Sequence, residues 1–161
     1  IIALDVQLRA AVLEMQTVGS LIGAPGEQRP ATGTDKEPVD SVTVKPKHGI
    51  VGDAHARNWH RQISLLAAES IAKMAIEYPH LRPGSFAENI TTEGLDLPRL
   101  PIGTRLKVGE VELEITQIGK KCHTKCKIYE QAGNCIMPTE GIFAKVLSGG
   151  ILNAGDKIVV V

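Results

Sequence analysis

The sequence predicts a mainly β protein of mixed β/α character, a barrel or sandwich with one main helix. Three observations support this fold class. Many short apolar segments are separated by regular glycine-containing turns, residues 104–118 have the pattern of a β-hairpin, and only residues 67–78 have a convincing helical pattern. A chain of 161 residues is most economically one domain and can bury a core without disulfides.

The first half of the chain contains an extension, two extended segments and a polar loop. Residues 1–16 fit either an alternating strand or an amphipathic helix, and we favour a helix in an extension that precedes a domain spanning residues 17–161. Residues 17–24 are expected to form a strand that stops at Pro25-Gly26. A polar loop is expected over 25–38, and an extended segment carries Val39, Val42 and Val44.

The second half has clearer sequence signals for the ends of its elements. We expect a buried strand at 62–66, a helix at about 67–78 that turns Ile71, Met74 and Ala75 inward and ends at Pro79, and an extended β-branched run within 86–92. Closing strands are expected at 142–147 and 158–161.

The hairpin is the most explicit local signal. Gly109-Glu110 between alternating segments predicts a type II′ turn, with Glu112 and Glu114 facing water. The apolar alternation slips between Ile115 and Ile118, which predicts a bulge or the end of the strand. The following residues would then lie on a loop at the rim of a sheet.

Composition excludes several classes of partner. The formal net charge is zero, the isoelectric point is near 7.1 and aromatic residues make up only 3%, so neither nucleic acid nor an acidic membrane is an expected partner. Charged residues interrupt the N-terminal apolar residues, and no apolar run approaches the roughly 20 residues of a membrane helix. With an odd count of three cysteines, these features predict a reduced, cytoplasmic protein.

Residues 120–127 form a basic cysteine segment, Lys-Lys-Cys-His-Thr-Lys-Cys-Lys, which has no carboxylate. Positive charge near Cys122 and Cys126 favours the thiolate, so these cysteines are candidates for a nucleophile or a metal ligand. The alternative is a solvated lysine-rich loop around an inert cysteine.

A second basic segment, residues 45–61, carries four Lys or Arg and three histidines against one acid, Asp53. Its glycines permit sharp turns or close approach to a ligand, so it could form a site with the cysteine segment or could simply be a solvated turn. A metal site from His48, His55 and His60 is less favoured, because their intervals do not place ligands on one helix face.

An ordered set of motifs resembles the MOSC domain, named for the C-terminal domain of molybdenum cofactor sulfurase. The set covers about residues 17–161 and resembles the small stand-alone bacterial members most. Its pieces are Gly49-Ile50-Val51-Gly52-Asp53-Ala54-His55, Arg61-Gln62-Ile63-Ser64-Leu65-Leu66, Gly84-Ser85-Phe86-Ala87-Glu88-Asn89-Ile90, Leu100-Pro101-Ile102-Gly103-Thr104, the Cys122 segment, and Gly141-Ile142-Phe143-Ala144-Lys145-Val146 ahead of Gly155-Asp156.

The resemblance implies a MOSC-like β-barrel with one main helix and short additional helices, in which Cys122, near the barrel rim, is the functional residue. It implies one of two roles. The protein is a sulfur carrier or sulfur transferase that accepts sulfur as a persulfide from a pyridoxal-phosphate-dependent cysteine desulfurase, or it binds molybdenum cofactor (molybdopterin) with Cys122 as metal ligand. Partners would be the desulfurase and molybdenum-cofactor enzymes or biosynthesis proteins. Candidate cofactor-binding residues are His55, Arg61, Asp53, Lys121, His123, Lys125, Glu88 and Asn89.

The chain departs from the family pattern in having Lys121 where many members have a proline before the cysteine. Two other functions remain open. One is a metal-binding or redox module that uses Cys122, His123 and Cys126, with Cys135 as a further ligand, although a second well-spaced ligand pair is missing. The other is a non-catalytic partner domain of a molybdenum-cofactor enzyme. Under the sulfur-carrier hypothesis, Cys126 is either a resolving thiol or a structural residue, and Cys135 is assigned to packing.

Overall fold

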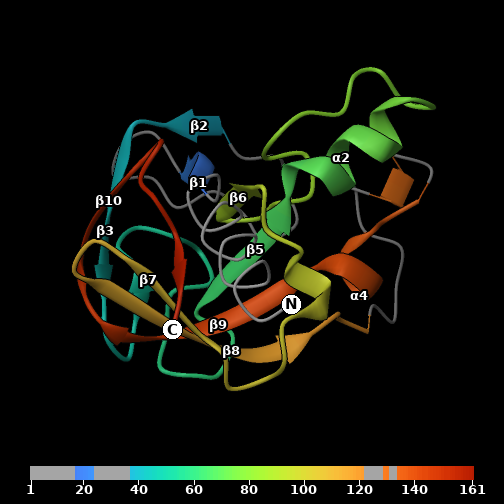
Figure 1. The fold of residues 1–161 in the computed structure, drawn as a ribbon. Coiled ribbons are helices and arrows are strands. Elements are labelled where there is room, and N and C mark those ends of the chain that lie inside the picture. The colour runs from blue at the N-terminus through green and yellow to red at the C-terminus, as the bar shows by residue number, and fades with distance from the viewer. Residues whose placement is uncertain (1–16, 24–36, 122–128, 131–133) are drawn as a thin grey trace, which may run out of the picture.

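The computed structural model describes residues 17–23, 37–121, 129–130 and 134–161. Their strands form an eight-stranded sheet in the order β11-β7-β8-β9-β5-β6-β1-β2 and a three-stranded sheet in the order β10-β3-β4. The large sheet curls, and α2 and α4 lie on its outside (Figure 1). The expected fold class, mainly β with one main helix and short additional ones, is confirmed.

The elements have the following bounds: β1 Thr17–Gly23, β2 Glu37–Val39, β3 Ser41–Lys45, β4 Gly49–Ile50, β5 Ile63–Ala67, α2 Ala68–Ala75, β6 Ile90–Glu93, the 3-10 helix η1 Leu97–Arg99, β7 Arg105–Val108, β8 Val111–Ile118, α4 Met137–Glu140, β9 Ile142–Ser148, β10 Gly150–Asn153 and β11 Val159–Val160. The expected extension at residues 1–16 and the expected loop at 24–36 fall outside the described residues.

Two apolar clusters lie on opposite faces of the large sheet. Successive side chains of a strand alternate between faces, so Leu65 of β5 joins the core within the curl while its neighbour Leu66 joins the cluster under α2. On β9, Ala144 and Phe143 divide in the same way. A sheet buried on both faces gives the site a rigid support.

The hairpin forms as its sequence predicts. β7 pairs antiparallel with β8, and the buried Val111, Leu113 and Ile115 face the core. Of the two turn residues only Gly109 has positive φ, at 59°, which fits a type II′ turn. The expected bulge is also present, because the register between β8 and β9 shifts between Ile115 and Gln117.

The main helix is shorter than its sequence pattern indicates. Its inward residues are as expected, but α2 ends at Ala75 rather than at Tyr78. The amides of Glu77 and Tyr78 both donate to the carbonyl oxygen of Met74, which closes the helix with a turn. Tyr78 precedes a proline and is therefore biased away from helical geometry, and its ring packs against the cluster under α2.

Three other elements differ from the sequence-based expectations. Pro38, expected in the polar loop, belongs to β2 at the edge of the large sheet, the position in a sheet at which proline is tolerated. Strand β10 and the location of the short helix α4 were not predicted, because glycine and proline dominate their surroundings. Within the described residues, no helix is long and apolar enough to cross a membrane.

Candidate functional site

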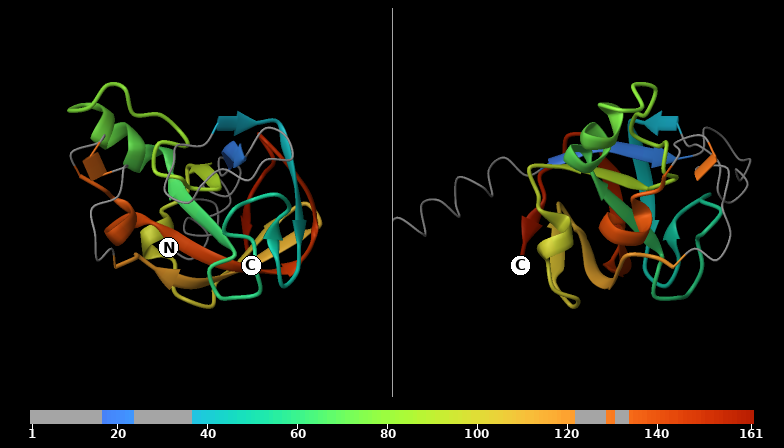
Figure 2. Two further views of the ribbon diagram at one scale, coloured as in Figure 1. Left: turned by 180° about the vertical axis from the view of Figure 1, so that it is seen from behind. Right: turned by 90° about the vertical axis from the view of Figure 1, so that its right-hand side faces the viewer.

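The connection between β4 and β5 forms a surface feature that we call the basic loop, residues 51–61. It projects from the edge of the molecule as the teal segment in the right panel of Figure 2. Its ionisable side chains are two arginines, two histidines and Asp53.

Asp53 organises the first half of the basic loop from the inside. Only 4% of the residue is exposed. Its Oδ1 accepts a 2.8 Å hydrogen bond from the backbone amide of His55, and the His55 Nδ1 lies 3.5 Å from the same oxygen. The carboxylate therefore closes a tight turn and orients the partly exposed imidazole.

Asn89 joins this turn to the sheet. Its Nδ2 donates a 2.9 Å hydrogen bond to Oδ2 of Asp53, and its Oδ1 accepts from the backbone amide and the hydroxyl of Ser64 at 2.9 and 3.0 Å. The Asn89 amide in turn donates to the Ser64 carbonyl oxygen at 2.9 Å. Both predicted site residues, Asp53 and Asn89, thus lie together, but they are buried supports of the loop.

Glu88, the neighbouring candidate, has a different setting. It is completely buried, and its carboxylate accepts hydrogen bonds from the amides of Gly84 and Phe86 and the hydroxyl of Thr91, at 2.6, 3.2 and 3.1 Å. Burial raises the pKa of the Glu88 carboxyl, and the hydrogen bonds only partly oppose this. Since Ala87 is held at a φ of +58° in the same turn, we assign Glu88 to shaping the turn before β6.

Two arginines of the basic loop stack on one tryptophan. The guanidinium carbon of Arg57 lies 3.8 Å from the centre of the Trp59 ring, and that of Arg61 lies 4.5 Å from it. Arg61 also lies 5.6 Å from the ring centre of Phe143, on β9. The sequence analysis singled out Arg61 but missed Trp59. The signal was available, because the single tryptophan of the chain has an arginine two residues before and two residues after it.

This cluster has hydrogen-bond donors but lacks acceptors. Among the described residues, Trp59 Nε1 and Arg61 Nε are buried without a hydrogen-bond partner. No ion pair joins Arg57 or Arg61 to a carboxylate of the described part of the chain. A buried donor without an acceptor costs about 1–3 kcal/mol. The cluster therefore favours a ligand that brings acceptor atoms and negative charge.

The far end of the basic loop is tied to the end of β8. The Thr116 hydroxyl contacts the carbonyl oxygen of His60 and, at 3.1 Å, that of Phe143, and His60 Nε2 lies 2.9 Å from Gln117 Oε1. Gln117 Nε2 donates to the carbonyl oxygen of Gly119 at 2.7 Å, and the Gly119 amide donates to Gly141 at 2.7 Å. The strand end that leads into the cysteine segment is thus held against the basic loop.

The cysteine segment itself is described only at its start. Lys120 is half-buried and Lys121 is exposed. Cys122, His123, Lys125 and Cys126 lie outside the described residues, so their predicted roles stay predictions. Cys135 is partly buried and packs against the cluster under α2, as expected of a packing residue. Within the described ranges, no three His, Cys, Asp or Glu side chains are grouped to hold a metal ion.

A comparison with protein families and a comparison with solved structures agree with each other. A family model described as MOSC domain matches residues 51–159. YiiM from Geobacillus stearothermophilus is similar with a TM-score of 0.70 and 22% identity, over 91% of this chain and 75% of that one.

Two further solved structures share the fold. The YuaD protein from Bacillus subtilis has a TM-score of 0.69 and 19% identity, over 89% of this chain and 94% of its own. YiiM from Escherichia coli has a TM-score of 0.64 and 19% identity, over 91% and 70%. A comparison with curated protein sequences found no match.

Proposed function

Because this chain belongs to the MOSC domain family, whose members are generally linked to molybdenum cofactor binding or sulfur transfer, we propose that it is a sulfur-carrier or molybdenum-cofactor-binding protein with Cys122 as its functional thiol. The observation that carries the proposal is the attachment of the β8 end to the basic loop through Thr116, His60 and Gln117. As a result, the chain enters the cysteine segment from beside a cationic surface whose buried donors Trp59 Nε1 and Arg61 Nε have no acceptor among the described residues.

The residues around Cys122 in the sequence suit it to react as a thiolate. Lys121 and His123 are its immediate neighbours, and Lys125 follows two residues later. Nearby positive charge favours the deprotonated thiol, which is the nucleophilic form. In the desulfurase the reacting group would be a cysteine persulfide, formed with the help of that partner's own pyridoxal phosphate.

The transfer step needs no external oxidant. The Cys122 thiolate attacks the terminal sulfur of the donor persulfide, a new sulfur–sulfur bond forms, and the donor's sulfur–sulfur bond breaks. The donor cysteine leaves as a thiolate, and Cys122 becomes the persulfide. One sulfur atom moves with its oxidation state unchanged, so atoms and electrons balance.

The described residues also fit an anionic cofactor. Trp59 and Arg61 supply buried donors that have no acceptor among the described residues, and Arg57 adds a second guanidinium over the same ring, which suits the phosphate of a molybdopterin better than an uncharged ligand. When bound, that group would supply a thiophilic metal centre for which a cysteine thiolate is a suitable ligand. Asp53 and Asn89 would act indirectly, by holding His55 and the basic loop in place.

Intact-mass spectrometry tests the sulfur-carrier branch. The wild type, Cys122→Ser and Cys135→Ser are each incubated with a cysteine desulfurase and free cysteine. We expect a gain of one sulfur, roughly 32 Da, in the wild type and in Cys135→Ser but not in Cys122→Ser. A gain that persists in Cys122→Ser would remove Cys122 from its proposed role. If no protein gains sulfur, cofactor binding remains as the other branch of the proposal. Molybdopterin retention by the wild type and by Cys122→Ser then tests it.

A further inference from the structure

We propose that the cavity between α2, the connection from β6 to η1, and α4 binds an aliphatic ammonium group, carried either by a small free amine or by a lysine side chain. The inference goes beyond the proposed function and does not rest on it. None of the residues that line this cavity belongs to the basic loop. Its volume of about 450 Å³ falls within the roughly 300–1,000 Å³ that ligand sites occupy.

Three elements of the fold meet around the cavity. The walls formed by α2 and by residues 94–96 are joined by a 2.7 Å hydrogen bond, which the backbone amide of Gly94 donates to Oε1 of Glu69. Glu140, the last residue of α4, lies on a third side, where α4 is next to η1 (Figure 1). Because regular elements surround it, the cavity is a preformed feature of the fold.

The charges around the cavity favour a cation. Its ionisable lining consists of the carboxylates of Glu69, Asp96 and Glu140 and the ammonium group of Lys73, which leaves a formal charge of −2. The N-terminus of α2 offsets this by only about half a positive charge. An anionic ligand is therefore disfavoured. A metal ion is also disfavoured, since no three His, Cys, Asp or Glu side chains of the described residues are grouped to hold one.

The carboxylates of the cavity still have unused acceptors. Within the described part of the chain, Oε2 of Glu69 accepts no hydrogen bond, and the half-buried Glu140 makes neither an ion pair nor a side-chain hydrogen bond. Asp96 is paired with Arg99 at 3.3 Å, but the exposed Lys73 forms no ion pair with a described residue. A ligand ammonium group would therefore not have to displace an internal cation from Glu69 or Glu140.

The buried residues that line the cavity form its floor, and they combine a hydroxyl with apolar side chains. Ser70 is only 5% exposed, and its hydroxyl makes no hydrogen bond with the described residues. A buried hydroxyl without a partner is unfavourable, so it favours a ligand that carries hydrogen-bond donors. Ala67 and Leu95 supply apolar surface to the same floor. An ammonium group on a short alkyl chain satisfies both parts of it.

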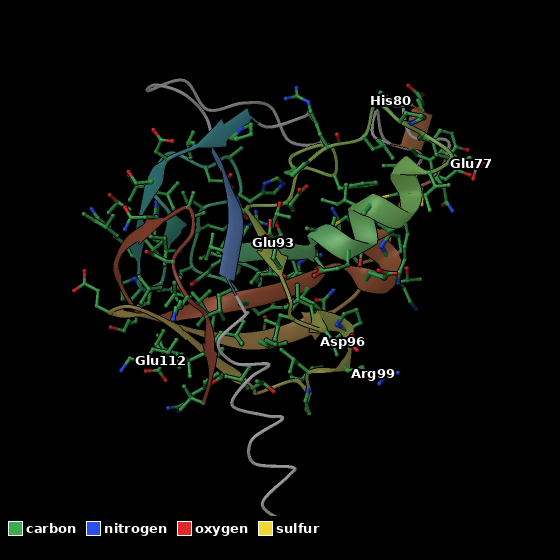
Figure 3. All side chains as sticks on the ribbon, turned by 45° about the horizontal axis from the view of Figure 1, so that its top comes forward. Glu77, His80, Glu93, Asp96, Arg99 and Glu112 are labelled. Carbon is green, nitrogen blue, oxygen red and sulfur yellow. The ribbon has the colours of Figure 1, made fainter. Side chains whose placement is uncertain are left out.

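Calorimetric titration with butylamine near neutral pH and at constant ionic strength tests the site. Binding to the wild type should be saturable, and butanol, which has the same chain but no charge, should give no saturable heat. Glu140→Gln should weaken butylamine binding at least fivefold. Glu77→Gln is the matched control, since it removes the same charge from an exposed residue just past the other end of α2 (Figure 3), and it should bind as the wild type does.

Two further variants separate binding from folding. Ser70→Ala should weaken butylamine binding several-fold, yet it should not lower the unfolding midpoint of the amine-free protein, because the hydroxyl has no partner to lose and alanine favours a helix. Lys73→Gln removes the cation that lines the cavity and should tighten binding at least twofold. Lys107→Gln, at an exposed position of β7, is its control and should leave the affinity unchanged.

The proposal is refuted if butylamine gives no saturable heat with the wild type, or if Glu140→Gln and Glu77→Gln bind it equally. A parallel titration with N-acetyl-lysine amide distinguishes the two sources of the ammonium group. Tighter binding of the lysine derivative than of butylamine would identify a protein side chain as the ligand, and the reverse order would identify a free amine. None of these titrations depends on sulfur uptake or on molybdopterin retention, so the site and the proposed function can fail separately.

Discussion

The side-chain amide of Asn89 donates a 2.9 Å hydrogen bond to the buried carboxylate of Asp53, a residue 36 positions earlier in the chain. Through this bond the turn before β6 holds the basic loop. Because Asn89 also accepts two hydrogen bonds from Ser64, one side chain connects the loop, β5 and the start of β6. The geometry at the candidate site therefore depends on a group that need not touch a ligand.

Asn89→Ala should destabilise the protein by about 2–4 kcal/mol, because it removes the acceptor of the Ser64 amide and one of the donors to the Asp53 carboxylate in a buried region. Urea denaturation measures the change. Asn58→Ala is the matched control, since Asn58 is exposed and its side chain makes no hydrogen bond to the described part of the chain, and it should change the free energy of unfolding by less than about 0.5 kcal/mol. Equal effects of the two changes would contradict the supporting role of Asn89.

The stability contributed by Glu88 should fall as pH rises. Burial raises the pKa of its carboxyl above the ordinary value of 4.5, so the folded state holds this proton more tightly than the unfolded state. The contribution is complete below pH 4.5 and is lost as pH rises through the folded pKa. Glu88→Gln cannot ionise, so the free energy of unfolding of the wild type minus that of the variant should decrease over this range.

Urea denaturation between about pH 4 and pH 8 gives the two curves for Glu88. Glu93→Gln is the control, because Glu93 is exposed on β6 (Figure 3), and its curve should run parallel to that of the wild type. A Glu88→Gln curve parallel to the wild type as well would show that the buried carboxyl does not govern the pH dependence.

Gly119 should not tolerate a side chain. Its φ is +73°, and an added Cβ would overlap the backbone carbonyl oxygen of Pro138. Gly119→Ala combines an unfavourable backbone conformation with a backbone clash and should cost about 3 kcal/mol or more. Gly103→Ala isolates the first effect, since Gly103 has a φ of +90° but open space around its Cβ position. It should cost only about 1 kcal/mol in the same denaturation experiment, and a smaller loss for Gly119→Ala than for Gly103→Ala would contradict this account.

Thr116→Val replaces the side chain by one of nearly the same shape and should loosen the basic loop. The hydroxyl contacts the carbonyl oxygens of His60 and Phe143, and its removal should cost about 1 kcal/mol. Hydrogen exchange should become faster at the amides of His60 and its neighbours, where local opening is easiest. Thr43→Val, at an exposed position of β3, is the control and should leave exchange in the basic loop unchanged.

The local elements could be predicted because their signals lie within a few residues. The alternation of Val111, Leu113 and Ile115 around Gly109 specified the hairpin, and the slip after Ile115 specified the bulge that the register confirms. The basic loop was likewise visible as a charge imbalance. The family resemblance rests on motifs of the same kind, each short and in a fixed order.

The contacts between residues far apart in the sequence were decided by tertiary structure. Parallel pairing of β5 with β6 sets Ser64 beside Asn89, and no local pattern indicates which distant strands will pair. The sequence marked Asp53, Glu88 and Asn89 as candidate site residues, and the structure shows all three buried and hydrogen-bonded within turns. Trp59 carried a signal in its two flanking arginines, but only the structure shows both guanidiniums over its ring. Residue type determines what a side chain can do, but its burial and its neighbours from other strands determine which of those roles it performs.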